Sequence, residues 1–307
     1  MGEQAKRIGE LGEEAAFKFL ERIGWTHGQR GVSIPCNDTV KHPDRETHGV
    51  DYLKVYSCPL IQQRLVNAVV SIKAKEDTYD KYPNSVLKKH LKELSDICNC
   101  YNRSDIKSET LSNFIVDQIF EHESIVGVLI WIVNNKEEIN RDLLKETSTA
   151  IIDGIEDYQF EAAYLVDLRR AEYIWEILNH ADKNFDGWEF LYIETGLNYR
   201  EDIKIKSGKL LPVEYINSSV IPFKQSKGSQ ENIVLYTIDN FHEDDLRKLI
   251  GLANKLSSSF ASTIFIIFPD YTNLKHENVV RKVLASFSDA DIMEKIKVIS
   301  YKDYLVN

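Results

Sequence analysis

The sequence predicts an α/β fold in which a mixed β-sheet is flanked by helices and is followed by a second, smaller α/β domain. Three observations lead to this prediction. Residues 4–23 have the apolar period of a helix, residues 67–75 alternate as a strand does, and beyond residue 125 dense apolar runs alternate with helical segments. A chain of 307 residues is typical of about two domains. We place their boundary between residues 183 and 184, where the composition becomes loop-like.

The composition excludes some classes of protein. A formal net charge of -10 argues against a protein that is coated with nucleic acid over its whole surface, but it leaves room for a local basic groove. The sequence has no apolar run long enough to cross a bilayer, and its first residues lack the features of a signal peptide. The cysteines Cys36, Cys58, Cys98 and Cys100 show no metal-site spacing, so we interpret them as unpaired thiols. We therefore expect a cytoplasmic protein without a membrane segment.

The first element is a helix over residues 4–23. Gly9 and Gly12 inside it cost roughly 1 kcal/mol each relative to alanine, so we expect a close backbone approach there. Glu13 follows the second glycine on the side of the apolar stripe. A solvated helix glutamate is the ordinary interpretation, but this position favours a functional acid. The apolar stripe consists of Ile8, Leu11, Ala15, Ala16, Phe19, Leu20 and Ile23.

The strand predicted over residues 67–75 carries two lysines on one face, which core packing does not explain. Asp51 stands alone in the apolar run of residues 50–53 that precedes it. A carboxylate and an ammonium group brought together at the ends of two strands can hold a divalent cation and neutralise a phosphate, which is the chemistry of phosphodiester cleavage. The predicted faces are Val70, Ile72 and Ala74 on one side, and Val69, Ser71, Lys73 and Lys75 on the other.

These segments together resemble a known superfamily. The helix reads Gly9-x-x-Gly12-Glu13-x-x-Ala16-x-x-Phe19-Leu20-x-x-x-Gly24-Trp25, and it is followed by Gly49-Val50-Asp51 and by Ser71-x-Lys73. This order resembles the PD-(D/E)XK, or restriction-endonuclease-like, nucleases, most closely the branch of YraN-like proteins, Mrr-like enzymes and Holliday-junction resolvases. The resemblance covers about the first half of the chain.

The resemblance implies a role for each of these residues. Glu13 and Asp51 would hold Mg²⁺ or Mn²⁺, with Asp51 as the central ligand. Lys73 would orient the attacking water and stabilise the transition state, and Lys75 would be a second phosphate contact. The implied fold is the restriction-endonuclease-like mixed sheet.

Ser71 departs from the superfamily pattern, which has Glu or Asp two residues before the lysine. A hydroxyl is a much poorer ligand for a hard cation than a carboxylate. Three explanations compete. The metal could be bound through Glu13, Asp51, water and the Ile72 carbonyl; an acid could have migrated, with Glu76 or Asp77 nearest in sequence; or the site could be inactive and kept for binding. We favour an active or weakly active site.

Asp44 and His48, which both precede Asp51 in the sequence, are further candidates for the active site. Asp44 follows a proline, as the motif acid would, but it lies in a polar segment, so we prefer Asp51. His48 would be a proton carrier or a phosphate contact, and a loop histidine without a role is an equal alternative.

A helix opening near residues 84–85 follows the lysine strand. In nucleases of the resembled superfamily the corresponding helix lines the substrate groove, so its basic flank is our candidate for phosphate contacts, with a solvated helix face as the alternative. The apolar stripe is Leu87, Leu91, Leu94, Ile97 and Cys98, and the basic flank is Lys88, Lys89, His90 and Lys92.

The rest of the chain alternates between strands and helices. No glycine-rich phosphate loop follows any of the later strands, so we expect the C-terminal domain to be an interaction or DNA-positioning module with a parallel α/β core. The predicted strands are residues 125–133, 162–168, 188–194, 209–214, 233–238, 263–268 and 296–299. The predicted helices are residues 140–154, 169–178, 243–256 and 277–287, and residues 218–229 are predicted to form a polar loop.

We therefore predict a divalent-metal-dependent deoxyribonuclease with a C-terminal α/β module. By its resemblance it would be the effector of a bacterial antiphage or restriction system, acting on DNA with a partner subunit or as a homo-oligomer. The alternative is a catalytically inactive protein of the same fold that binds nucleic acid or scaffolds a partner.

Overall fold

The computed structural model describes residues 2–38, 40–114, 120–148, 159–197, 205–256 and 261–302. The chain forms two compact units. The first comprises Met1–Glu172 with Gly196–Glu201 and Pro212–Asn217, and the second comprises the remainder. The chain first passes from one unit to the other between residues 172 and 173, whereas the sequence places the domain boundary between residues 183 and 184. Among the described helices, none is long and apolar enough to cross a membrane.

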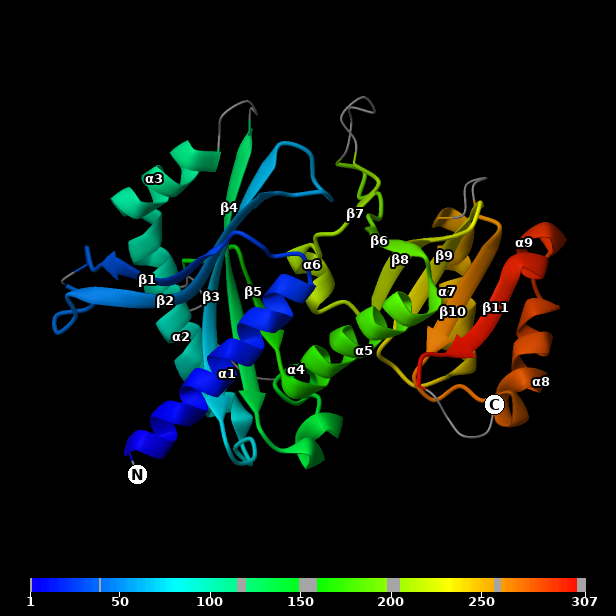
Figure 1. Ribbon diagram of the computed structural model, residues 1–307, viewed down its shortest axis with the longest axis horizontal. Coiled ribbons are helices and arrows are strands. Elements are labelled where there is room, and N and C mark those ends of the chain that lie inside the picture. The colour runs from blue at the N-terminus through cyan, green and yellow to red at the C-terminus, as the bar shows by residue number, and fades with distance from the viewer. Residues whose placement is uncertain are drawn as a thin grey trace. The chain divides into compact units, whose positions relative to one another are not determined.

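The first unit contains a five-stranded mixed sheet in the order β1-β2-β3-β4-β5 (Figure 1). β1, β2 and β3 form an antiparallel meander, and β3, β4 and β5 run parallel. The mixed sheet flanked by helices is confirmed. The strands are β1 (Gln29–Pro35), β2 (Thr47–Ser57), β3 (Arg64–Lys75), β4 (His122–Val133) and β5 (Ala162–Val166).

Helices α1 (Gly2–Arg22) and α2 (Pro83–Asn102) pack on opposite faces of this sheet. Ala74 faces α1, since a Cβ on Gly12 would meet the Ala74 Cβ at 2.1 Å. Val69 points the other way, into the core that α2 covers with Leu91 and Leu94. The two predicted faces of the lysine strand are therefore confirmed.

Gly12 fulfils the expected close approach of α1 to the sheet, but Gly9 does not. A Cβ on Gly9 would meet nothing within 4 Å, so its place in the helix has no packing explanation. Within the predicted stripe of α1, Ala16, Phe19, Leu20 and Ile23 are buried. Leu11 is 59% exposed and Ala15 is exposed as well, so the buried face of α1 is narrower than the predicted stripe.

Shorter helices complete the first unit. The segment predicted as a helix over residues 140–154 is only partly helical where it is described, and residues 149–154 lie outside the described residues. The helices are α3 (Asp105–Phe114), the 3₁₀ helix η1 (Lys136–Asn140), α4 (Leu143–Glu146) and α6 (Val213–Ile216), and α5 (Leu168–Asn184) begins in this unit and continues into the second.

The second unit contains a six-stranded sheet in the order β11-β10-β9-β8-β6-β7. The three strands β9, β10 and β11 are parallel, as predicted, and β8, β6 and β7 are antiparallel to their neighbours. The elements are β6 (Gly187–Leu191), β7 (Ser207–Gly208), β8 (Val220–Lys227), β9 (Gln230–Thr237), α7 (Glu243–Leu256), β10 (Thr263–Phe268), α8 (Asn273–Leu284), α9 (Ala290–Lys295) and β11 (Ile296–Ser300).

Two predictions for this part of the chain are wrong. Residues 209–214 do not form a strand, because Pro212 caps the short helix α6. Residues 218–229 are not a loop but contain strand β8, which forms a hairpin with β9 through a turn at Gly228, where φ is +57°.

Candidate active site

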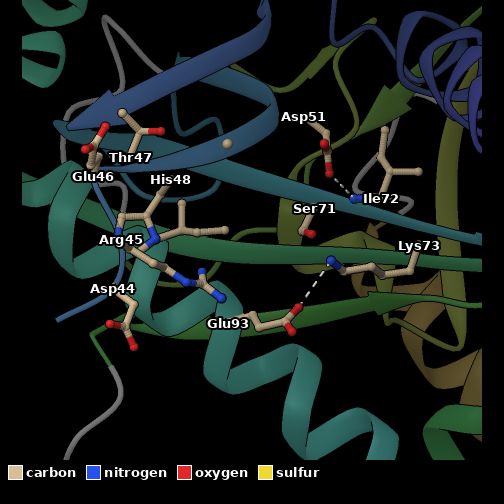
Figure 2. Close-up of a pocket in the computed structure, with 12 residues that line it drawn as sticks. Asp44, Arg45, Glu46, Thr47, His48, Asp51, Ser71, Ile72, Lys73 and Glu93 are labelled. Atoms are coloured by element: carbon tan, nitrogen blue, oxygen red, sulfur yellow. Dashed lines mark hydrogen bonds and ion pairs between the residues drawn. The ribbon is translucent and has the colours of Figure 1, made fainter. Parts of the chain in front are cut away.

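The site is built where strands β2 and β3 separate. Their ladder runs from Ser57↔Leu65 to Tyr52↔Val70 and ends there. Asp51 is the first residue of β2 beyond the last pair, and its carboxylate Oδ2 accepts a 2.6 Å hydrogen bond from the Ile72 backbone N–H (Figure 2). A side chain therefore satisfies the backbone group that the ladder leaves unpaired, and this contact fixes the Asp51 carboxylate in the gap.

The environment of Asp51 resists its negative charge. Burial raises the pKa of Asp51, while the Ile72 N–H, the Lys73 ammonium and the Ser71 hydroxyl act in the opposite direction without cancelling the rise. A buried carboxylate with a raised pKa gains from a nearby cation, because a cation stabilises the ionised form.

Glu13 approaches the same carboxylate from α1. Burial raises the pKa of Glu13, and repulsion from Asp51 and Glu10 adds to the rise. The close contact of Gly12 with Ala74 is what brings this turn of α1 against the sheet. Glu13 itself is exposed and does not line the pocket described below, so it lies at the edge of the site on the α1 face of the sheet.

Lys73 lies on the face of β3 that α2 covers, opposite to the face that α1 covers. It forms an ion pair with an acid that the sequence did not indicate. Its Nζ is 3.2 Å from Oε2 of Glu93, which α2 contributes (Figure 2). Burial raises the pKa of Glu93, but the charge of Lys73 and its hydrogen bond outweigh burial, and the net shift is downward. Glu93 is therefore ionised at neutral pH and holds the amine at the site.

A pocket of about 660 Å³ joins these groups. Ser71 contributes its hydroxyl to the pocket and is 6% exposed. The Arg45 side chain enters from the loop between β1 and β2 (Figure 2). The lining residues are Asp44, Arg45, Glu46, Thr47, His48, Gly49, Asp51, Ser71, Ile72, Lys73, Glu93 and Ile97.

The structure thus brings together five of the predicted site residues, namely His48, Asp51, Ser71, Ile72 and Lys73. Asp44, the rival to Asp51, also lines the pocket, but from its loop wall. Glu76 and Asp77, the two acids proposed from the sequence to replace the motif acid, are exposed after β3 and do not line the pocket. Glu93, which the sequence did not suggest, does line the pocket.

The predicted basic residues lie outside the pocket lining. Lys75 forms an ion pair with Asp80 at 3.1 Å. On α2, Lys89 and Lys92 are exposed, whereas Lys88 is half-buried. Lys89 lies one turn before Glu93, close enough for its charge to lower the pKa of that residue. Their roles in substrate binding stay predictions.

Arg45 and Glu93 are functional candidates that sequence reasoning missed. Glu93 precedes the buried Leu94 and lies four residues before the buried Ile97, so it sits at the edge of the sheet-facing side of α2. That position, an acid beside an apolar stripe, was the available signal.

A mixed sheet with an acid at the separation of two strands and a lysine on the second strand defines a PD-(D/E)XK nuclease domain. Residues 1–170, more than half of the chain, match the family described as the GAPS4 protein PD-(D/E)XK nuclease domain, and the chain belongs to this family. The comparison with curated proteins gave no match.

Proposed function

We propose that the chain is a divalent-metal-dependent deoxyribonuclease whose catalytic groups are Asp51, Lys73, Glu93 and Glu13. The observation that carries the proposal is the pocket in which the Asp51 carboxylate and the Lys73–Glu93 ion pair face the same space. Membership of a nuclease family supports the reaction class.

The donor set fits Mg²⁺ or Mn²⁺. These cations prefer oxygen ligands, and the site offers the carboxylates of Glu13 and Asp51 together with the Ile72 carbonyl. Burial raises the pKa of both acids, and repulsion from Asp51 raises the pKa of Glu13 further, so the residues favour a cation between them. When bound, the cation would activate water and offset phosphate charge.

The other groups of the pocket have distinct roles in this proposal. Lys73 donates hydrogen bonds to the scissile phosphate and is positioned by its ion pair with Glu93. In this proposal Glu93 brings to the pocket, from α2, the carboxylate that position 71 lacks, and it would complete the ligands of the cation. Ser71 supports Asp51 through its hydroxyl.

Basic side chains around the pocket would hold the nucleic-acid backbone. Arg45 reaches into the pocket, and Lys89 is close enough to Glu93 to affect its pKa, while Lys75, Lys88 and Lys92 are not among the lining residues. A chain with a net charge of -10 needs such a local cationic path to admit a polyanion.

The biological setting rests on resemblance. We propose an effector of a bacterial antiphage or restriction system that acts in the cytoplasm with a partner subunit or as a homo-oligomer. The likeness of the opening helix to the YraN-like, Mrr-like and Holliday-junction-resolvase branch is part of the same proposal. The C-terminal unit would position the substrate or bind the partner.

A cleavage assay tests the proposal. Supercoiled, linear, branched and single-stranded DNA, and RNA, are incubated with the full chain in Mg²⁺, Mn²⁺ or chelator. We expect metal-dependent cutting of DNA that Asp51→Ala and Lys73→Ala abolish. Lys282→Ala, which removes an exposed lysine of α8, is the control and should cut normally. Salt-sensitive DNA binding without cutting under any metal would instead support the inactive binding protein.

A further inference from the structure

Two cysteines and two histidines gather beside the candidate active site. Cys36 follows β1, His42 lies in the loop between β1 and β2, His48 is on β2, and Cys100 is near the end of α2. One nitrogen or sulfur atom of each lies within 4.8 Å of the corresponding atom of every other. Three of the four residues are buried, and Cys36 is half-buried. The nuclease mechanism uses none of these thiols.

The spacing of these atoms matches a tetrahedral metal site. With metal–sulfur bonds of about 2.3 Å and metal–nitrogen bonds of about 2.0 Å, a tetrahedron has S···S edges of about 3.8 Å and S···N edges of about 3.5 Å. The Sγ atoms of Cys36 and Cys100 are 3.9 Å apart. Nδ1 of His42 lies 3.4 Å from the first sulfur and 3.8 Å from the second.

His48 gives the second, independent observation. The residue is 2% exposed, yet neither ring nitrogen has a hydrogen-bond partner among the described residues. A buried polar atom without a partner costs about 1–3 kcal/mol, so native proteins rarely leave one. The ring instead lies edge-on to His42, with centroids 4.9 Å apart. A metal bound by one nitrogen would account for the burial of this ring.

The surroundings orient the ligand atoms. Nε2 of His42 lies 3.2 Å from Oδ1 of Asp96, which leaves Nδ1 directed at the two sulfurs. A carboxylate behind a metal-binding histidine is a common second layer of such sites, because it fixes the tautomer and the ring. The backbone N–H groups of Asn37 and Asp38 hydrogen-bond the Cys100 sulfur and hold it in place.

We propose that Cys36, His42, His48 and Cys100 bind a structural Zn²⁺ ion. Two thiolates and two imidazoles in a closed tetrahedral set are ligands typical of zinc, whereas the oxygen-rich catalytic pocket suits Mg²⁺ or Mn²⁺. The ion would tie the loop between β1 and β2 to the end of α2. That loop forms one wall of the active-site pocket, so zinc would hold the wall that carries Arg45. His48 would then be a zinc ligand and not a substrate contact.

Metal analysis of the purified full chain tests this assignment. After reconstitution with Zn²⁺ and removal of loosely bound metal, elemental analysis should give about one zinc per chain. Cys36→Ala and Cys100→Ala should lose it. Cys58→Ala and Cys98→Ala, which remove buried thiols outside the cluster, should retain it. Asp51→Asn should also retain it, which separates this site from the proposed catalytic cation.

Cobalt gives a readout that needs no variant. In the wild-type chain Co²⁺ should produce the thiolate-to-cobalt charge-transfer absorption and the intense visible bands of tetrahedral coordination, and Zn²⁺ should remove both. The assignment is overturned if the wild-type chain holds less than about 0.1 zinc per chain, if thiolate bands are absent, or if Cys36→Ala binds as the wild type does. A Cys36–Cys100 disulfide, detected as the loss of two titratable thiols in the denatured chain without reductant, would overturn it as well.

Discussion

The Lys73 ammonium on β3 lies 3.2 Å from the Glu93 carboxylate on α2, so the lysine of the nuclease motif is paired with an acid from a different element. This pairing bears on the serine that stands two residues before the lysine. The site lacks a carboxylate at position 71, yet α2 returns one to the same pocket. The loss of the usual acid on the strand is therefore compatible with an active site.

Glu93→Gln should reduce metal-dependent cleavage by about 100-fold or more, because it removes the acid that positions Lys73 and replaces the missing motif acid. Initial cleavage rates at saturating Mg²⁺ measure the effect. Glu277→Gln, which neutralises an exposed acid on α8, should leave the rate unchanged. Equal rates for Glu93→Gln and wild type would remove Glu93 from the mechanism.

An aspartate introduced at position 71 of β3 should substitute for Glu93 of α2. We expect Ser71→Asp combined with Glu93→Gln to recover at least about tenfold of the rate that Glu93→Gln loses, because the carboxylate returns to the pocket from the motif position. Ser71→Asn in the same background is the control, since it has nearly the same shape without the charge. If the two double variants are equally slow, the proposed migration of the acid is wrong.

The pH dependence should reflect the raised pKa values of Glu13 and Asp51. Both carboxylates must be ionised to bind a cation, and both have a folded-state pKa above the ordinary 4.5 and 3.8. The cleavage rate should be at its maximum above the raised pKa values and should fall as the pH drops through them. This fall should occur at a higher pH than it would if the carboxylates were exposed. Rates measured at several Mg²⁺ concentrations test this. Raising the Mg²⁺ concentration should move the acidic limb to lower pH, and a limb that does not respond would contradict the proposal.

Asp51→Asn should stabilise the metal-free protein at neutral pH. A folded-state pKa above the unfolded value means that the folded chain holds the proton more tightly, so above that pKa the ionised carboxylate lowers the stability of the fold. Asparagine keeps an oxygen for the Ile72 N–H and carries no charge. Its melting temperature should exceed that of the wild type without metal, and the rise that Mn²⁺ causes in the wild type should be lost. A lower melting temperature together with a retained Mn²⁺ effect would contradict the role given to Asp51.

Alanine substitutions at Gly9 and Gly12 of α1 test whether this helix packs against β3 at Gly12. Gly12→Ala should destabilise the fold by about 1–3 kcal/mol, because its Cβ would collide with Ala74. Gly9→Ala, where space is open, should stabilise the fold by about 0.5–1 kcal/mol through helix propensity. Urea denaturation of the two variants gives both values. Equal effects would show that α1 does not pack against β3 as described.

Much of the fold follows from periodicity in the sequence. The apolar stripe of α1, the two faces of β3 and the parallel strands of the second unit depend on spacings within single elements. Strand β8 was missed because Ser226, its two lysines and Pro222 are typical of loops. Pro222 is tolerated because it lies beyond the last residue of β8 that pairs with β6.

The site was predictable only where its residues belong to one motif. Asp51 and Lys73 follow from their strands, but Glu93 depends on how α2 packs over the sheet. The cluster proposed to bind zinc was missed for the same reason, since its residues come from the segment between β1 and β2, from β2 and from α2. Cys98 is buried outside the cluster, because residues two apart on a helix face different directions.

In the proposed mechanism the Asp51 carboxylate, fixed in the gap between β2 and β3, holds the catalytic cation. Anomalous diffraction from crystals of the full chain soaked in Mn²⁺ tests it most directly. We expect a manganese peak within about 2.5 Å of an Asp51 carboxylate oxygen, and its absence from crystals of Asp51→Asn. A wild-type crystal without a peak at Asp51, at a Mn²⁺ concentration that supports cleavage in solution, would contradict the claim.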